Sequence, residues 1–136
     1  MPNQPFIDKL AWIQIVDKKI ICTLSKGKDT YYIPGGKREV NETDHEALIR
    51  EIKEELSVDL IPETIKSIGV FEAQAHGKPE GVVVQMTCYS SAYRGTLRPA
   101  SEIAELAWFT HKDKEKCSAV DKIIFDWLHE RGLIAD

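Results

Sequence analysis

Three glutamates, at positions 51, 54 and 55, are the side chains in this sequence best suited to chemistry. On an α-helix with about 100° between successive residues, Glu51, Glu54 and Glu55 lie at angles of about 0°, 300° and 40°. All three therefore project from one side of the helix, within an arc of about 100°. Carboxylates gathered in this way can bind a divalent cation, because hard cations such as Mg²⁺ prefer oxygen ligands. Like charges one turn apart also destabilise a helix, which a sequence selected only for stability would avoid.

A second interpretation treats this acidic run as a solvated helix face. Arg50 is spaced four residues from both Glu46 and Glu54, so that it can form an ion pair with either one. The loop before the helix favours the metal-site interpretation. Pro34-Gly35-Gly36 lets the backbone approach closely, so that a carbonyl oxygen can join a cation. Glu42, just before the helix, can reach the same region.

The segment from Gly36 to Val58 resembles the signature of the Nudix hydrolase (MutT-like) family, G-x5-E-x7-R-E-U-x-E-E-x-G-U, where U is a bulky aliphatic residue. The residues that match it at the required spacing are Gly36, Glu42, Arg50, Glu51, Ile52, Glu54, Glu55 and Val58. The YYIPGGK lead-in also looks like the strand that usually precedes this motif. Ser57 departs from it, because the family has glycine there to end the helix in a left-handed turn. A non-glycine residue in that conformation costs about 1–2 kcal/mol.

The resemblance implies an enzyme that hydrolyses a diphosphate bond with Mg²⁺, for which Mn²⁺ can substitute. Glu54, Glu55 and the carbonyl group of Gly36 would be metal ligands. Glu51 would be a further ligand or the base that orients the attacking water. Arg50 would hold a glutamate in place by charge-assisted hydrogen bonds.

The general base varies within this family, and some members take it from a later loop. Glu102, in SEIAELAWF, and Glu80, in GKPEG, are the candidates in this chain. For each of them, a surface glutamate without a catalytic role is the alternative interpretation.

Residues outside the motif are expected to select the substrate. Asp121 opens the last expected helix, where relatives often place a side chain that reads a nucleobase edge; its alternative role is a first-turn acid paired with Ser118. Lys37 and Arg38, beside the glycine turn, are candidates for contacts with phosphate, or else face solvent. The aromatic side chains that could stack on a base, or pack in the core, are Tyr31, Tyr32, Phe71 and Trp108.

Strands and helices alternate along the chain in a mixed order. Strands are predicted over residues 9–16, 19–24, 30–33, 67–75, 82–93 and 106–109. A helix is predicted over residues 43–56, begun by a capping box of Thr43 and Glu46, and a second over residues 118–131. This order predicts an α/β (α+β) class with a mixed sheet covered by helices on two sides. The resemblance implies the Nudix α/β/α sandwich with its loop–helix–loop.

Composition limits the other classes of protein. The 136 residues fit one domain, residues 1–136, with 43% hydrophobic residues and no apolar run long enough for a membrane span. A net charge of −4 argues against a nucleic-acid binder that relies on a basic surface. Three scattered cysteines without a CxxC pair predict neither disulfides nor a zinc site. No signal peptide is evident, and a cytoplasmic location is expected.

The predicted function is Mg²⁺-dependent hydrolysis of a nucleoside triphosphate or another nucleoside diphosphate-linked small molecule, by attack of water at phosphorus. The sequence leaves a homodimer open. One alternative is a Nudix-fold sensor that binds a nucleotide without cutting it, although such proteins often lose motif glutamates that are all present here. A second is an isoprenyl-diphosphate isomerase, for which none of the cysteines has a recognisable context.

Overall fold

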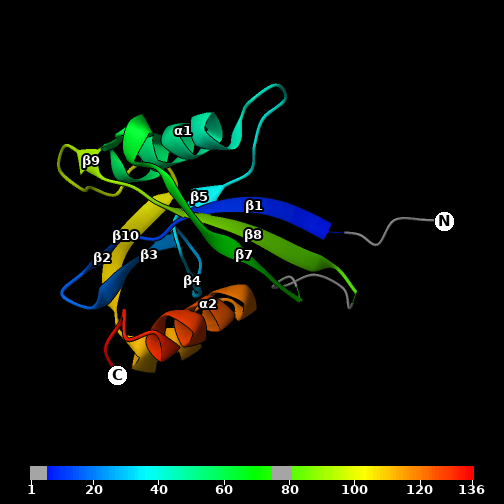
Figure 1. The fold of residues 1–136 in the computed structure, drawn as a ribbon, viewed down its shortest axis with the longest axis vertical. Helices are drawn as coiled ribbons and strands as arrows, with labels where there is room; N and C mark the ends of the chain where they lie inside the picture. The colour runs from blue at the N-terminus through cyan, green and yellow to red at the C-terminus, as the bar shows by residue number, and fades with distance from the viewer. Residues whose placement is uncertain (1–5, 75–80) are drawn as a thin grey trace.

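The computed structural model describes residues 6–74 and 81–136 of the chain. Figure 1 shows a layered arrangement in which the strands lie between two helices, α1 (Asp44–Leu56) and α2 (Ala119–Glu130). Two short 3-10 helices, η1 (Pro62–Thr64) and η2 (His111–Lys116), complete the helical segments of the described residues. The predicted α+β class and the α/β/α sandwich are therefore confirmed.

The strands form two main sheets and one short pair. The first sheet has the order β5 (Gly35–Gly36), β1 (Phe6–Trp12), β8 (Val83–Ser90) and β7 (Lys66–Gln74). It is mixed, because β1 and β8 run parallel whereas the other neighbours are antiparallel. The second sheet has the order β10 (Ile103–Phe109), β3 (Lys19–Ser25) and β2 (Ile15–Val16), with β4 (Tyr31–Tyr32) also paired to β3. The short pair is β6 (Asp59–Leu60) with β9 (Tyr93–Arg94).

Both faces of the central strands are buried against a helix. In β3, Ile20 and Cys22 pack in the core that contains the apolar side of α2, whereas Ile21 between them packs in the core of α1. Successive side chains of a strand point to opposite faces, which explains this alternation. Burial on both faces also explains why β3 reads as a continuous apolar run. The two cores fix α1 and α2 on opposite sides of the strands.

Helix α1 begins and ends as the sequence predicts. The Thr43 hydroxyl accepts a hydrogen bond from the Glu46 backbone N–H at 3.1 Å, and the Glu46 carboxylate accepts one from the Thr43 N–H at 3.0 Å. This capping box satisfies two backbone donors that the first turn leaves free. The helix ends at Ser57, whose φ of 65° and ψ of 21° place it in the left-handed region. The left-handed turn that the motif places at this position is therefore present, although the residue is not glycine.

Two of the predicted strands are wrong, because each contains a break that the apolar pattern conceals. The predicted strand over residues 9–16 divides into β1 and β2, which belong to different sheets. Ile13, between them, donates its backbone N–H to the Tyr89 carbonyl at 2.8 Å. The predicted strand over residues 82–93 likewise divides into β8 and β9. Tertiary pairing decides these breaks, and the very short strands β5 and β6 were not predicted for the same reason.

All three cysteines of the chain, Cys22, Cys88 and Cys117, are buried free thiols, in agreement with the absence of a predicted disulfide. No helix in the described part of the chain is both long enough and apolar enough to cross a membrane.

Replacing Ser57 by glycine tests the strain at the end of α1. We expect Ser57→Gly to leave the free energy of unfolding unchanged or to raise it by up to about 1 kcal/mol, because glycine adopts positive φ without steric cost. The variant loses only one exposed hydrogen bond, from the Ser57 hydroxyl to the Arg98 carbonyl. Urea unfolding would measure the difference.

Ser67→Gly in β7 is the matched control, since glycine inside a strand is destabilising. A clear loss of stability in Ser57→Gly would contradict the proposed strain.

Candidate active site

A cleft of about 290 Å³ lies beside the N-terminal segment of the motif and one face of α1. It is built from several elements: β1, β3, β4, β5, β8, α1 and the residues that lead into β10. The charged side chains that line it are Lys9, Glu51, Glu55 and Glu102. The main-chain atoms of Gly35 and Gly36 form part of the same wall. The cleft therefore collects carboxylates from two distant parts of the sequence.

Arg50 ties the loop before α1 to the helix. Its Nε and Nη2 atoms donate to the two carboxylate oxygens of Glu42 at 2.7 and 2.8 Å, which is a bidentate pair. Its Nη2 atom also donates to the Lys37 carbonyl at 3.0 Å. Its Nη1 atom donates to Glu51 at 3.2 Å and lies 3.5 Å from Glu54. Arg50 thus contacts the carboxylates of Glu42, Glu51 and Glu54 at once, while its role in the reaction stays a prediction.

The Arg50 guanidinium lowers the pKa of Glu42 to about 2, chiefly through its hydrogen bonds to that carboxylate. Burial raises the pKa of Glu51, although Arg50 opposes this effect. The two carboxylates held by the same arginine therefore differ in their surroundings. The negative charge of Glu42 is balanced by the Arg50 guanidinium, whereas Glu51 faces the other carboxylates of the cleft.

Glu55 is the most deeply placed of the three helix glutamates, with an exposure of only 6%. Burial, followed by repulsion from Glu51, raises its pKa to about 8. The Gly35 backbone N–H donates to Glu55 Oε1 at 3.3 Å and partly opposes this rise. A carboxylate in such surroundings is stabilised as an anion if a cation joins it.

The glycines at positions 35 and 36 allow the backbone to pass close to both β1 and α1. A Cβ atom on Gly35 would lie 2.0 Å from the Leu10 carbonyl oxygen. A Cβ atom on Gly36 would lie 2.4 Å from the carboxylate carbon of Glu51. Only glycine leaves the Gly36 main chain and the Glu51 carboxylate this close together. This proximity suits a cation that takes oxygen ligands from both, as the sequence predicts.

The possible metal-binding side chains do not, however, converge on a single point. Among the described residues, no group of three or more His, Cys, Asp or Glu side chains is arranged to hold a metal ion. Glu54 accounts for part of this, because its side chain is 52% exposed and lies beside Arg50. The ligand types fit Mg²⁺, but the assignment of Gly36, Glu51, Glu54 and Glu55 as its ligands stays a prediction.

Comparisons with known proteins identify the family of the chain. The family model of the NUDIX domain matches residues 13–128. The chain belongs to the Nudix family. It is 31% identical over 116 residues to a protein from Methanocaldococcus jannaschii named ADP-ribose pyrophosphatase, a match that covers 82% of this chain and 67% of that one. As a Nudix hydrolase, the chain is an enzyme that acts on diphosphate bonds.

Solved structures with low sequence identity share the fold. A MutT Nudix hydrolase from Burkholderia pseudomallei superposes with a TM-score of 0.73 and 21% identity, covering 89% of this chain and 96% of that one. A MutT protein from Methanosarcina mazei gives a TM-score of 0.75 and 15% identity, with 97% and 99% of the two chains covered. Both support the Nudix fold for the strands and helices described above.

Asp121, the predicted reader of a nucleobase, lies inside the protein. It is 0% exposed and accepts a hydrogen bond from the Ser118 hydroxyl at 2.7 Å. Burial raises its pKa to about 7. The pairing with Ser118 is the one that the alternative interpretation predicted. Asp121 does not line the cleft, and its role in base selection stays a prediction.

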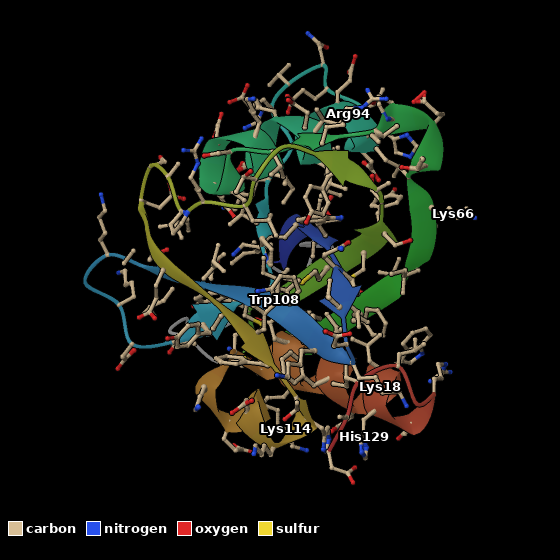
Figure 2. All side chains as sticks on the ribbon, turned by 90° about the vertical axis from the view of Figure 1, so that its left-hand side faces the viewer. Lys18, Lys66, Arg94, Trp108, Lys114 and His129 are labelled. Atoms are coloured by element: carbon tan, nitrogen blue, oxygen red, sulfur yellow. The ribbon has the colours of Figure 1, made fainter. Side chains whose placement is uncertain are left out.

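The other predicted substrate residues are divided between the cleft and the surface. Arg38 forms ion pairs with Asp8 and Asp44, and Lys37 offers its carbonyl to Arg50; neither side chain lines the cleft. Tyr32 lines the cleft, whereas Trp108 packs against the core of α1 and lies near the middle of the molecule in Figure 2. Tyr31 and Phe71 pack against the core of α2.

Of the two candidates for a later general base, Glu102 lines the cleft, and Glu80 lies outside the described residues. The sequence prediction missed Lys9, Thr23 and Ser25, which the cleft also contains. Polar side chains within otherwise apolar strands were the available signal for all three. Nothing in the local pattern shows that these strands end at one cleft.

The Arg50–Glu42 pair predicts a pH-dependent contribution to stability. The pKa of Glu42 is lower in the folded protein than its ordinary value of 4.5, so the stabilisation is complete above about pH 5. It is lost as the pH falls toward 2. We expect Arg50→Ala to lower the free energy of unfolding at pH 6, and the difference from the wild type to shrink toward pH 2.

Urea unfolding at a series of pH values would measure this difference. Glu39→Gln is the control, because Glu39 is largely exposed and 3.8 Å from Arg50 Nε, and its effect should be small at every pH. An Arg50→Ala effect that is independent of pH would contradict the assignment.

Gly36→Ala tests the close approach of the main chain to Glu51. We expect hydrolysis of diphosphate substrates to fall about 100-fold, because the new methyl group must displace the Glu51 carboxylate. Gly69→Ala is the control, since its Cβ atom would meet only the Phe71 ring at an ordinary distance of 3.5 Å. Steady-state kinetics, with circular dichroism to check the fold, would measure both. Wild-type activity in Gly36→Ala would show that hydrolysis does not depend on the present position of the Glu51 carboxylate.

Proposed function

We propose that this protein is a Mg²⁺-dependent hydrolase of nucleoside triphosphates or other nucleoside diphosphate-linked small molecules. The observation that supports this most directly is the cleft in which Glu51, Glu55 and Glu102 meet the main chain of Gly36. An acidic cleft repels a polyphosphate unless cations neutralise it, and carboxylate and carbonyl oxygens are the ligands that Mg²⁺ prefers. When bound, Mg²⁺ would neutralise charge on the phosphoryl oxygens and lower the pKa of water.

The motif residues would have separate roles in metal binding and positioning. Glu51, Glu54, Glu55 and the Gly36 carbonyl would hold the metal. Arg50 would fix the direction of Glu51 through the hydrogen bond at 3.2 Å, with Glu42 fixing Arg50 in turn. This second layer of contacts matters because ligands held in advance need little rearrangement during the reaction.

The reaction would be attack of water at phosphorus, with formation of one P–O bond and rupture of the P–O bond to the leaving phosphate. A carboxylate would accept the proton of the water. Glu51 and Glu102 are the candidates for this base, since both line the cleft and come from separate elements. Glu102 is exposed and can approach a substrate, whereas Glu51 is held by Arg50.

The choice of substrates to test rests on the relative from Methanocaldococcus jannaschii. The name of that relative, ADP-ribose pyrophosphatase, makes ADP-ribose the first compound to assay, followed by nucleoside triphosphates. A nucleotide sensor that does not cut is the second candidate. The full set of motif glutamates favours the enzyme, since a sensor would have no use for the repulsion among Glu51, Glu55 and Glu102.

Glu55→Gln and Glu54→Gln test the proposal. We expect each to reduce Mg²⁺-dependent hydrolysis by on the order of 10²–10³-fold, because each removes one charged ligand. Glutamine at position 55 keeps an oxygen that can accept the Gly35 N–H, so the fold should be retained. Phosphate release from a panel of nucleotides would measure the rates.

Glu130→Gln, at the exposed end of α2, is the control and should have wild-type activity. Undiminished activity in both Glu54→Gln and Glu55→Gln would mean that the metal binds elsewhere. A wild-type protein that binds nucleotides but hydrolyses none of them would favour the sensor.

A further inference from the structure

Lys9 is the one basic side chain among the described residues that line the cleft. It lies in β1, where it pairs with Met86 of β8, so its backbone belongs to the centre of the first sheet. The carboxylates of the cleft come instead from α1 and from the residue before β10. Lys9 is half-buried, and lysine is seldom buried without a partner.

The Lys9 ammonium is held over the ring of Tyr32, at 5.4 Å from the ring centre. This cation–π contact fixes the direction of a long side chain that would otherwise be mobile. Within residues 6–74 and 81–136, Lys9 Nζ has neither a hydrogen-bond acceptor nor an ion-pair partner. Its three N–H donors are therefore not used by the described part of the fold.

The charge of Lys9 acts on two buried carboxylates, Glu55 on α1 and Asp121 on α2. Neither carboxylate lies within ion-pair distance of Lys9. Lys9 therefore forms an ion pair with neither carboxylate. An oxygen that enters the cleft can accept its donors without breaking a contact of the fold.

We propose that Lys9 binds a non-bridging oxygen of the substrate's diphosphate and is a substrate-binding residue of this cleft. The inference rests on the proposed function, because it takes the diphosphate as the ligand. An ammonium group is a compact charge with three donors, which suits a phosphate oxygen. The hydroxyl groups of Thr23 and Ser25 line the same cleft and make this wall polar rather than acidic. The diphosphate would then lie between the carboxylate-held metal and Lys9.

Steady-state kinetics of Lys9→Gln and Lys9→Arg test the proposal with ADP-ribose, ATP, GTP and UTP. Removal of a hydrogen bond to a charged group commonly costs 10- to 100-fold, so we expect Lys9→Gln to raise KM by roughly that factor. The increase should be the same for all bases, because every substrate carries the diphosphate. Lys9→Arg should recover part of the loss.

Lys66→Gln is the matched control, because Lys66 is also a strand lysine but lies on the edge strand β7, at the rim of the molecule in Figure 2. It should leave KM unchanged. A loss in Lys9→Gln confined to one base would overturn the proposal in favour of a nucleobase contact. An unchanged KM with an increased Mg²⁺ requirement would also overturn it, because Lys9 would then act through Glu55.

Direct binding separates this inference from the proposed function. Calorimetry with the α,β-methylene analogues of ADP and UDP, which resist hydrolysis, should show weaker binding of both to Lys9→Gln than to the wild type. Even if the wild type hydrolysed nothing in the panel, weaker binding of both analogues would support the role of Lys9. Equal binding by the folded variant and the wild type would overturn it.

Discussion

The crowding of carboxylates beside Gly36 is the constraint on which the rest of this structure depends. Glu51 and Glu55 lie one turn apart on α1, and Glu102 reaches the same cleft. Their mutual repulsion, added to burial, raises the pKa of Glu55 to about 8. Such an arrangement lowers the stability of the folded chain, so several contacts must oppose it. Arg50 and the Gly35 N–H supply two of them directly.

The remaining contacts hold α1 at a fixed distance from the cleft wall. The capping box begins the helix, and the left-handed residue Ser57 ends it. The strand pair of β5 with β1 places Gly36 opposite Leu10, which is buried in the core of α1. Each contact is modest by itself, but together they hold α1 in place against the repulsion among the carboxylates of the cleft. Functional sites in which like charges repel one another commonly lower the stability of the folded protein.

Positive charge is distributed in this molecule in two different ways. Arg50 is fully engaged, with ion pairs to four carboxylates and a hydrogen bond to one carbonyl. Lys9 is held only by the ring of Tyr32 within the described residues. An engaged guanidinium maintains the shape of the motif, while an ammonium with free donors is available to a ligand. The difference follows from the guanidinium's rigid fork and the ammonium's compact charge.

The sequence by itself determined the motif, both ends of α1, the position of α2 and the class of the fold. Those features depend on short-range rules: a capping box, a helical period of apolar residues, and glycine or its substitute at a left-handed turn. The sequence predicts that Arg50 holds a glutamate, but the structure shows that this partner is chiefly Glu42.

Tertiary structure alone decided where the strands over residues 9–16 and 82–93 break, because an apolar run does not show which sheet each of its parts joins. It also buried Asp121 and brought Lys9 and Glu102 into one cleft. Lys9 is separated from Glu102 and Asp121 by most of the chain. How close they lie is determined only by the packing of α2 and by the pairing of β1 with β8 and of β3 with β10.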